Sequence, residues 1–121
     1  MRIMKVLLVD DNEDITELLS KFLKAKGFEI VETNNAMEGL RHIQQEKYDA
    51  ILLDMKMPGI SGFNIIQLLA TDDILKDQNI FIFSASAFGE NEIRGLLRRD
   101  GVNGVLKKPM KLDEILTAIT N

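Results

Sequence analysis

Three acidic residues and one lysine stand where short apolar runs of this chain end. Asp10 and Asp11 follow the first run, Asp54 follows another, and Lys108 follows the last. Such runs are typical of buried parallel strands, and ligand sites in open α/β sheets lie at the carboxyl ends of these strands. The three carboxylates and the ammonium group are therefore expected to share one crevice.

This set of side chains suits the transfer of a phosphoryl group. Three close carboxylates repel one another and need a cation to stay ionised, and Mg²⁺ prefers oxygen ligands. One Mg²⁺ and one lysine nearly balance the three negative charges and could also neutralise charge on a phosphoryl group. Asp54 is the expected nucleophile, because Asp10 and Asp11 form a metal-holding pair opposite it. Ser84, at the end of a further apolar run, can donate a hydrogen bond to a phosphoryl oxygen, and Lys108 can contact another.

Length and composition limit the possible classes of protein. The chain has 121 residues, of which 45% are hydrophobic, so one domain covering residues 1–121 is expected. A net charge of −4 argues against direct binding of nucleic acid, which usually requires a basic patch. The absence of cysteine excludes disulfides and thiolate metal sites. No secretory signal or apolar span of about 18 residues is present, so we expect a soluble, cytoplasmic domain without membrane contact.

Apolar periodicity predicts five strands that alternate with five helices. The strands are expected at 6–9, 29–33, 48–53, 80–83 and 105–107. The helices are expected from a cap at 11–12 to Gly27, at 36–45, after a cap at Ser61, at 91–99 and at 112–119, with a turn at 101–104. This alternation predicts an α/β fold with a single doubly wound parallel sheet, flavodoxin-like, in the strand order 2-1-3-4-5. The first and third strands, which carry the acidic residues, are then neighbours.

Four short motifs in this order resemble those of the receiver domain of response regulators in two-component signalling. They are Val9-Asp10-Asp11, Leu53-Asp54-Met55-Lys56-Met57-Pro58-Gly59, Ser84-Ala85 and Lys108-Pro109. The resemblance covers essentially the whole chain. Within the family, the chain is similar to the stand-alone chemotaxis regulator. Each motif alone is weak, whereas the ordered set is specific.

The resemblance implies a role for each acidic residue. Asp54 would accept a phosphoryl group from a histidine kinase or a histidine phosphotransfer protein. Asp11 and Asp54 would bind Mg²⁺ directly with the backbone carbonyl of Lys56, and Asp10 would act partly through water. The domain would be a switch and not an enzyme, except for its own phosphorylation from a donor and its own dephosphorylation.

The resemblance also implies how the signal leaves the site. Ser84 would be the hydroxyl that moves toward the phosphoryl group, and Lys108 would bind a phosphoryl oxygen, with a cis bond to Pro109. Lys107 would remain in solvent, because the family places the active lysine directly before proline. Phosphorylation would shift the population of a two-state surface made by the fourth helix, fifth strand and fifth helix. That surface would bind a downstream protein, and the domain would be a monomer or a phosphorylation-dependent dimer.

Val105 departs from the family pattern, and Lys56 and Ser86 bear on the lifetime of the phosphorylated state. Val105 stands where the family usually has an aromatic residue that turns inward, so output through helix displacement alone, or use as a phosphoryl relay, is the resulting hypothesis. Lys56 at the mouth of the site could slow the attack of water, and Ser86 has no carboxylate to position that water. A phosphorylated lifetime of minutes or longer is therefore predicted.

Other functions remain open on the sequence alone. A receiver-like interaction module that works without phosphorylation is one alternative, and Val105 keeps it open. An aspartyl-phosphate phosphatase of the dehalogenase-like type would need an Asp-x-Asp pattern after the first strand, where this chain has Asp10-Asp11-Asn12. A flavin-binding module would need a phosphate-cradling loop at the same place, where two carboxylates would repel the phosphate.

Overall fold

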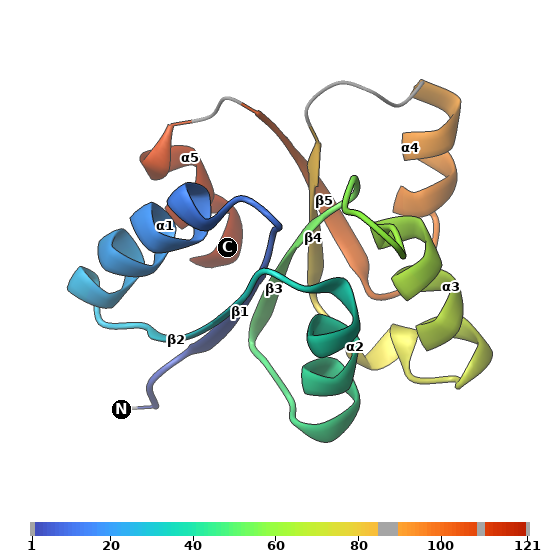
Figure 1. Ribbon diagram of the computed structural model, residues 1–121, viewed down its shortest axis with the longest axis horizontal. Coiled ribbons are helices and arrows are strands. Elements are labelled where there is room, and N and C mark those ends of the chain that lie inside the picture. The colour runs from blue at the N-terminus through green and yellow to red at the C-terminus, as the bar shows by residue number, and fades with distance from the viewer. Residues whose placement is uncertain (1, 85–89, 109–110, 121) are drawn as a thin grey trace.

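The computed structural model describes residues 2–84, 90–108 and 111–120, and these form a parallel sheet with helices on both faces (Figure 1). The sheet has five strands in the order β2-β1-β3-β4-β5, which confirms the predicted fold class. The strands are β1 (Lys5–Val9), β2 (Glu29–Thr33), β3 (Ala50–Asp54), β4 (Ile80–Ser84) and β5 (Val102–Lys107). The helices are α1 (Glu13–Ala25), α2 (Ala36–Gln45), α3 (Gly62–Thr71), α4 (Glu90–Leu97) and α5 (Leu112–Thr120), with a short 3-10 helix η1 (Leu75–Asp77) before β4.

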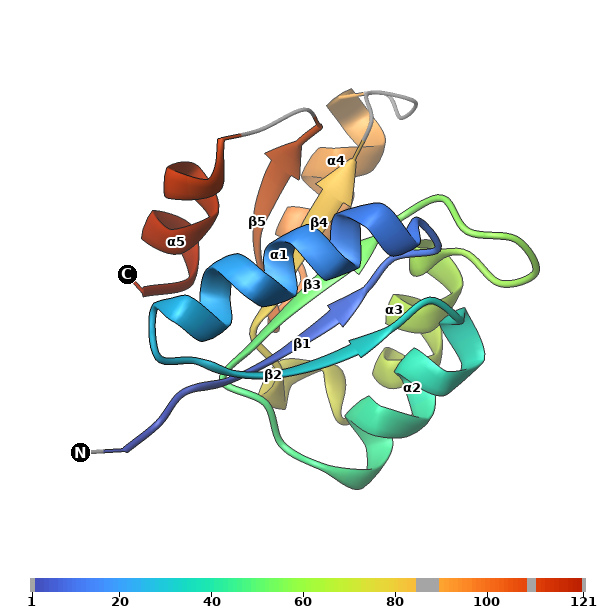
Figure 2. The same cartoon turned by 60° about the vertical axis from the view of Figure 1, so that its left-hand side comes forward.

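The central strands are buried on both faces because alternate side chains enter two separate cores. Leu7 of β1 and Ile51 of β3 belong to the core that is covered by α2, α3 and α4. Leu8 and Leu52, one position further along the same strands, belong to the core that is covered by α1 and α5. Figures 1 and 2 show the two groups of helices on opposite faces of the sheet. Strands β1 and β3 pair in parallel with Val9 opposite Leu53, so their carboxyl ends lie side by side.

The predicted helix boundaries depend on side-chain caps that the structure contains. Asn12 caps α1, and its Oδ1 accepts hydrogen bonds from the backbone N–H groups of Asp14 and Ile15. Gly27 follows α1 with a φ of +95°, which is the left-handed conformation that favours glycine. Ser61 caps α3 in a capping box with Asn64.

The predicted turn at 101–104 is wrong, because β5 begins at Val102 instead of residue 105. The register between β4 and β5 shifts at this point, where Ile80 pairs with Val102 and Phe81 pairs with Gly104. A Cβ atom on Gly104 would lie 3.0 Å from Cδ1 of Phe81, so the strand approaches the aromatic ring closely here. Glycine in this stretch therefore indicates a bulged strand and not a turn.

The other differences from the predicted elements are small. β3 spans Ala50–Asp54 instead of 48–53, and α4 spans Glu90–Leu97 instead of 91–99. The helix η1 was not predicted. The shift of β3 matters for function, because it makes Asp54 the last residue of the strand itself, paired with Phe83 of β4.

Candidate functional site

Asp54 is held at the carboxyl end of β3 in a buried position. Its residue surface is 5% exposed, and its neighbours Leu53 and Met55 are fully buried. The backbone N–H of Lys56 lies 3.3 Å from Oδ1 of Asp54 and donates to it. The carboxylate is therefore fixed by the strand and by the start of the following loop.

Asp10 and Asp11 follow β1, the strand beside β3, and differ in exposure. Asp10 is 4% exposed, and its Oδ1 accepts a 2.9 Å hydrogen bond from the backbone N–H of Asn12. Asp11 is exposed to solvent. One carboxylate oxygen from each of Asp10, Asp11 and Asp54 lies within 4.8 Å of the others. The structure therefore brings together the three carboxylates that the sequence placed at one edge of the sheet.

Lys108 follows β5 and reaches across the sheet edge to this cluster. Its Nζ lies 2.7 Å from Oδ2 of Asp10 and 3.6 Å from Oδ1 of Asp54. The same ammonium group lies 5.4 Å from the centre of the Phe83 ring. Lys107 is exposed, as predicted, and Lys108 is the lysine that joins the site.

The site carries more negative charge than its own residues neutralise. The pKa of the Asp54 carboxyl is raised from 3.8 to about 6, first by burial and then by the negative charge of Asp10. Lys108 and the N–H of Lys56 act in the opposite direction without cancelling these effects. A hard divalent cation would supply the missing positive charge, and three carboxylates at this spacing are suitable oxygen ligands for Mg²⁺. The donor set therefore fits the metal that the sequence suggested.

Several predicted features lie outside the described part of the structure. The backbone of Ser84 is described as the end of β4, but its side chain is not, and Ser86 lies outside the described residues. Pro109 also lies outside them, and with it the predicted cis bond from Lys108. Val105 is described; it is half-buried and packs against the core beside α4.

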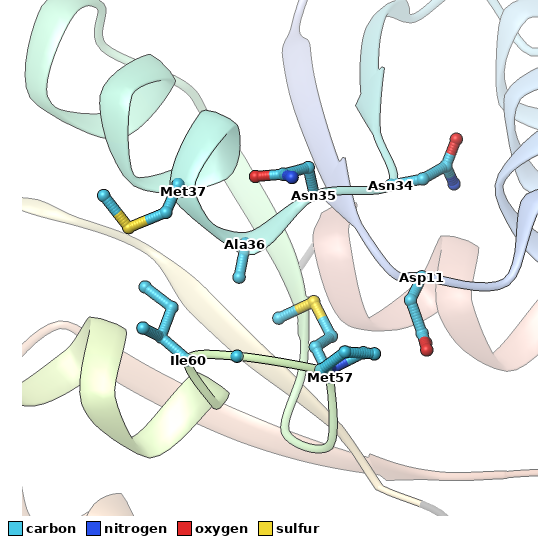
Figure 3. A pocket seen from close by; sticks show the side chains of 9 residues that line it. Asp11, Asn34, Asn35, Ala36, Met37, Met57 and Ile60 are labelled. Carbon is cyan, nitrogen blue, oxygen red and sulfur yellow. The ribbon is translucent and has the colours of Figure 1, made fainter.

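A groove of about 300 Å³ beside Asp11 was not predicted from the sequence. Figure 3 shows Met37, Met57 and Ile60 around this space, while Asn34 points away from them. Its lining comes from the loops that follow three different strands and from the first turn of α2, so no periodic pattern in the sequence could have indicated it. The adjacent pair Asn34 and Asn35 after β2 was the available signal, since asparagine often makes side-chain hydrogen bonds in loops.

A family model described as the response regulator receiver domain matches residues 6–120. The chain therefore belongs to the receiver domain family of two-component response regulators. Receiver domains of this class are signalling modules, and the acidic site is consistent with a phosphorylation-dependent switch. Within the part of the chain that the structure describes, no helix is long and apolar enough to cross a membrane.

Three similar proteins illustrate the range of the family. The chain is 35% identical over 115 residues to the transcriptional regulatory protein CpxR homolog of Haemophilus influenzae, covering 95% of this chain but only 48% of that protein. It is 30% identical over 115 residues to sporulation initiation phosphotransferase F of Bacillus subtilis, covering 95% and 90% of the two chains. The structure of response regulator protein TrrA from Thermotoga maritima in complex with Mg²⁺-BeF superposes with a TM-score of 0.80 at 29% identity, covering 98% and 97%.

Proposed function

We propose that this chain is a signalling switch or phosphoryl relay that accepts a phosphoryl group on Asp54 from a histidine kinase or a histidine phosphotransfer protein. The observation that carries the proposal is the buried carboxylate of Asp54 within 4.8 Å of two further carboxylates and 3.6 Å from the Lys108 ammonium. The name of the Bacillus relative, a phosphotransferase, supports the relay form of the function. The whole domain, residues 1–121, is proposed to act as one receiver unit.

Asp10, Asp11 and Asp54 are proposed to hold Mg²⁺ together with the backbone carbonyl of Lys56. Mg²⁺, when bound, neutralises negative charge on the phosphoryl oxygens. Asp10 is tied to Lys108 at 2.7 Å, so it is suited to contact the metal partly through water, whereas the exposed Asp11 is free to turn toward it. The solved relative that is described as a complex with Mg²⁺-BeF supports this assignment.

In the proposed transfer, one bond to phosphorus forms and another breaks. A carboxylate oxygen of Asp54 attacks the phosphorus of a phosphohistidine donor, the O–P bond forms, and the N–P bond breaks. The bonding electron pair stays on the imidazole nitrogen, which then takes a proton from water. Lys108 neutralises part of the negative charge on the phosphoryl oxygens, because its ammonium group already lies close to Asp54.

The output is proposed to follow from a change in charge at the carboxyl ends of β3, β4 and β5. An acyl phosphate on Asp54 adds roughly one negative charge and three acceptor oxygens at the end of β3. Ser84 at the end of β4 would donate a hydrogen bond to one of them, and Lys108 would shift from Asp10 toward another. The surface of α4, β5 and α5 would then change its affinity for a downstream protein. We place this protein in the cytoplasm, as a monomer or a phosphorylation-dependent dimer, without direct contact to nucleic acid or membrane.

The test is intact-protein mass spectrometry after incubation with acetyl phosphate and Mg²⁺. Wild type and Asp72→Asn, which removes an exposed carboxylate at the far end of α3, should each gain one phosphoryl group of about 80 Da. Asp54→Asn should gain none, and chelation of Mg²⁺ should abolish the gain in wild type. A full gain in Asp54→Asn would refute the assignment of the acceptor.

A receiver-like module that works without phosphorylation is the alternative, and Val105 is the observation that favours it. Valine cannot make the inward turn that the family pattern assigns to an aromatic residue. Wild type that binds Mg²⁺ but gains no phosphoryl group from acetyl phosphate, phosphoramidate or a phosphorylated histidine kinase would support this alternative. Wild type that gains the group and then binds a partner more tightly would exclude it.

A further inference from the structure

We propose that Asn34 is a positioning residue that holds the Asp10–Asp11 peptide group in the orientation required for metal binding. The inference rests on the proposed function, because it concerns the same acidic site. Asn34 lies in the loop between β2 and α2, and it is half-buried. Its side chain points away from the apolar side chains of the groove (Figure 3).

The Asn34 side chain joins two segments of the site with one amide group. Its Nδ2 donates to the main-chain carbonyl oxygen of Asp10 at 2.8 Å and to Oγ1 of Thr16 at 2.9 Å. The Asp10 carbonyl belongs to the peptide group that links Asp10 to Asp11. Because a peptide group is planar, a fixed oxygen also fixes the direction in which the Asp11 Cα leaves it. Asn34 therefore acts on Asp11 through the backbone, without touching its carboxylate.

The chemistry of both partners requires an amide nitrogen at this position. A main-chain carbonyl can only accept, and the single hydroxyl proton of Thr16 is directed at the carbonyl oxygen of Glu13, 3.1 Å away. The two N–H groups of one amide nitrogen satisfy both acceptors. Thr16 is 1% exposed and lies in α1, so the second attachment point of Asn34 is a buried, rigid one.

The other hydrogen bonds of this turn are made to the N–H and the carboxylate of Asp10. The backbone N–H of Asp10 donates to the carbonyl of Thr33 at 3.2 Å, and the Asp10 carboxylate is held by Asn12 and Lys108. The bond from the Asn12 N–H spans the Asp10–Asp11 peptide group, whereas the bond from Asn34 is made directly to the carbonyl oxygen of that group. Asp11 itself is exposed and gains little order from packing. Without Asn34, this peptide group would lose the bond to its carbonyl oxygen, and binding of the metal would have to restrict its remaining motion, so the affinity for Mg²⁺ should fall.

The decisive measurement is Mg²⁺ binding by calorimetry to wild type, Asn34→Leu, Thr16→Val and Thr16→Ser. Asn34→Leu, which keeps the side-chain size, should weaken Mg²⁺ binding about 10-fold, the low end for residues that orient metal ligands. Thr16→Val should weaken Mg²⁺ binding less than Asn34→Leu does. Thr16→Ser, which keeps the hydroxyl, should bind Mg²⁺ with the affinity of wild type. At saturating Mg²⁺, Asn34→Leu should be phosphorylated by acetyl phosphate at nearly the wild-type rate.

The matched control is Asn35→Ala, one residue further along the same loop. Asn35 lines the same groove but caps α2, where its Oδ1 accepts from the N–H of Glu38 at 3.1 Å. A second readout needs no metal: the amide hydrogen of Asn12, which donates to the Asp10 carboxylate across this peptide group, should exchange faster in Asn34→Leu than in wild type or Asn35→Ala.

Two results would overturn the inference while leaving the proposed function intact. One is wild-type Mg²⁺ affinity in Asn34→Leu, and the other is an equal loss of affinity in Asn35→Ala, which would indicate general loosening of the loop. If wild type binds no Mg²⁺, the proposed function is refuted. The exchange of the Asn12 amide in the metal-free protein then still decides whether Asn34 holds this peptide group.

Discussion

The ammonium group of Lys108 lies 2.7 Å from Oδ2 of Asp10, across 98 positions of the sequence. This ion pair is largely buried, with the two side chains 18% and 6% exposed. In the metal-free protein, Lys108 therefore neutralises mainly the carboxylate of Asp10. It neutralises the carboxylate of Asp54, the proposed phosphoryl acceptor, to a lesser extent.

Removal of this ammonium group should destabilise the metal-free protein. Lys108→Met leaves two buried carboxylates without their cation, and we expect a loss of about 2 kcal/mol in the free energy of unfolding, below the value for a fully buried pair because Lys108 keeps some exposure. Millimolar Mg²⁺ should restore part of the loss. Urea unfolding with and without Mg²⁺ measures both. Lys107→Met, in the exposed neighbour, should change little, and an equal loss in this control would contradict the assignment.

Replacement of the buried Asp54 carboxylate should stabilise the metal-free protein near neutral pH. The pKa of Asp54 is raised from 3.8 to about 6, so this carboxyl favours the folded state most below pH 3.8, and that contribution is lost as pH rises through 6. Asp54→Asn never ionises, so it should be more stable than wild type by about 2–3 kcal/mol at about pH 8, with the difference vanishing below about pH 4. Urea unfolding in a chelating buffer across this range measures the difference. If Asp54→Asn were less stable than wild type near pH 8, the negative charge of the Asp54 carboxylate would be better compensated than its burial indicates.

Mg²⁺ affinity should fall as the solution becomes more acidic. Protons and the metal compete for the Asp54 carboxylate, whose pKa in the metal-free protein is about 6. The affinity should be nearly constant above about pH 7 and should decrease by up to about 10-fold per pH unit below about pH 6. Calorimetric titrations at several pH values give the profile. A flat profile across this range would exclude Asp54 from the metal site.

Two glycine-to-alanine substitutions should have opposite effects on stability. A Cβ on Gly62 would lie 2.8 Å from the carbonyl oxygen of Asp54 and 2.6 Å from Sδ of Met55, whereas a Cβ on Gly95 meets nothing within 4 Å. Gly62→Ala should therefore destabilise the protein by about 1–3 kcal/mol through overpacking. Gly95→Ala in α4 should stabilise it by up to about 1 kcal/mol, since alanine favours the helix. Thermal unfolding of wild type and both variants measures these changes in stability. Stabilisation by Gly62→Ala would show that α3 is free to move away from β3.

The phosphorylated form should persist for minutes or longer at neutral pH. Lys56 is exposed beside the acceptor, and the sequence has serine at position 86, where a carboxylate could have positioned water. Ser86→Glu should shorten the lifetime, while Lys56→Ala tests whether its side chain screens the phosphoryl group. The decay of the phosphorylated mass after removal of the donor gives the rate, and a wild-type lifetime of seconds would contradict the prediction.

Sequence alone was sufficient to predict five strands, five helices and the grouping of the three carboxylates with Lys108. Alternating apolar runs carry the strand signal, caps such as Asn12 and Ser61 mark helix starts, and a parallel sheet places the residue after each strand at one edge. This is why the positions of Asp10, Asp11, Asp54 and Lys108 along the chain are enough to group them. The extent of β5 was not predictable in this way, because its register shift against β4 involves pairing of Gly104 with Phe81, which is distant in sequence.

The local pattern of this chain thus determined which residues meet, because strand period and strand order are properties of short segments and their alternation. Only the tertiary structure decided how they meet. The preference of Lys108 for Asp10 over Asp54, the raised pKa of Asp54 and the bond from Asn34 to the Asp10 carbonyl all depend on burial and on distances between segments far apart in the chain. Desolvation and hydrogen-bond geometry change over fractions of an ångström, and residue spacing along a sequence carries no information at that scale.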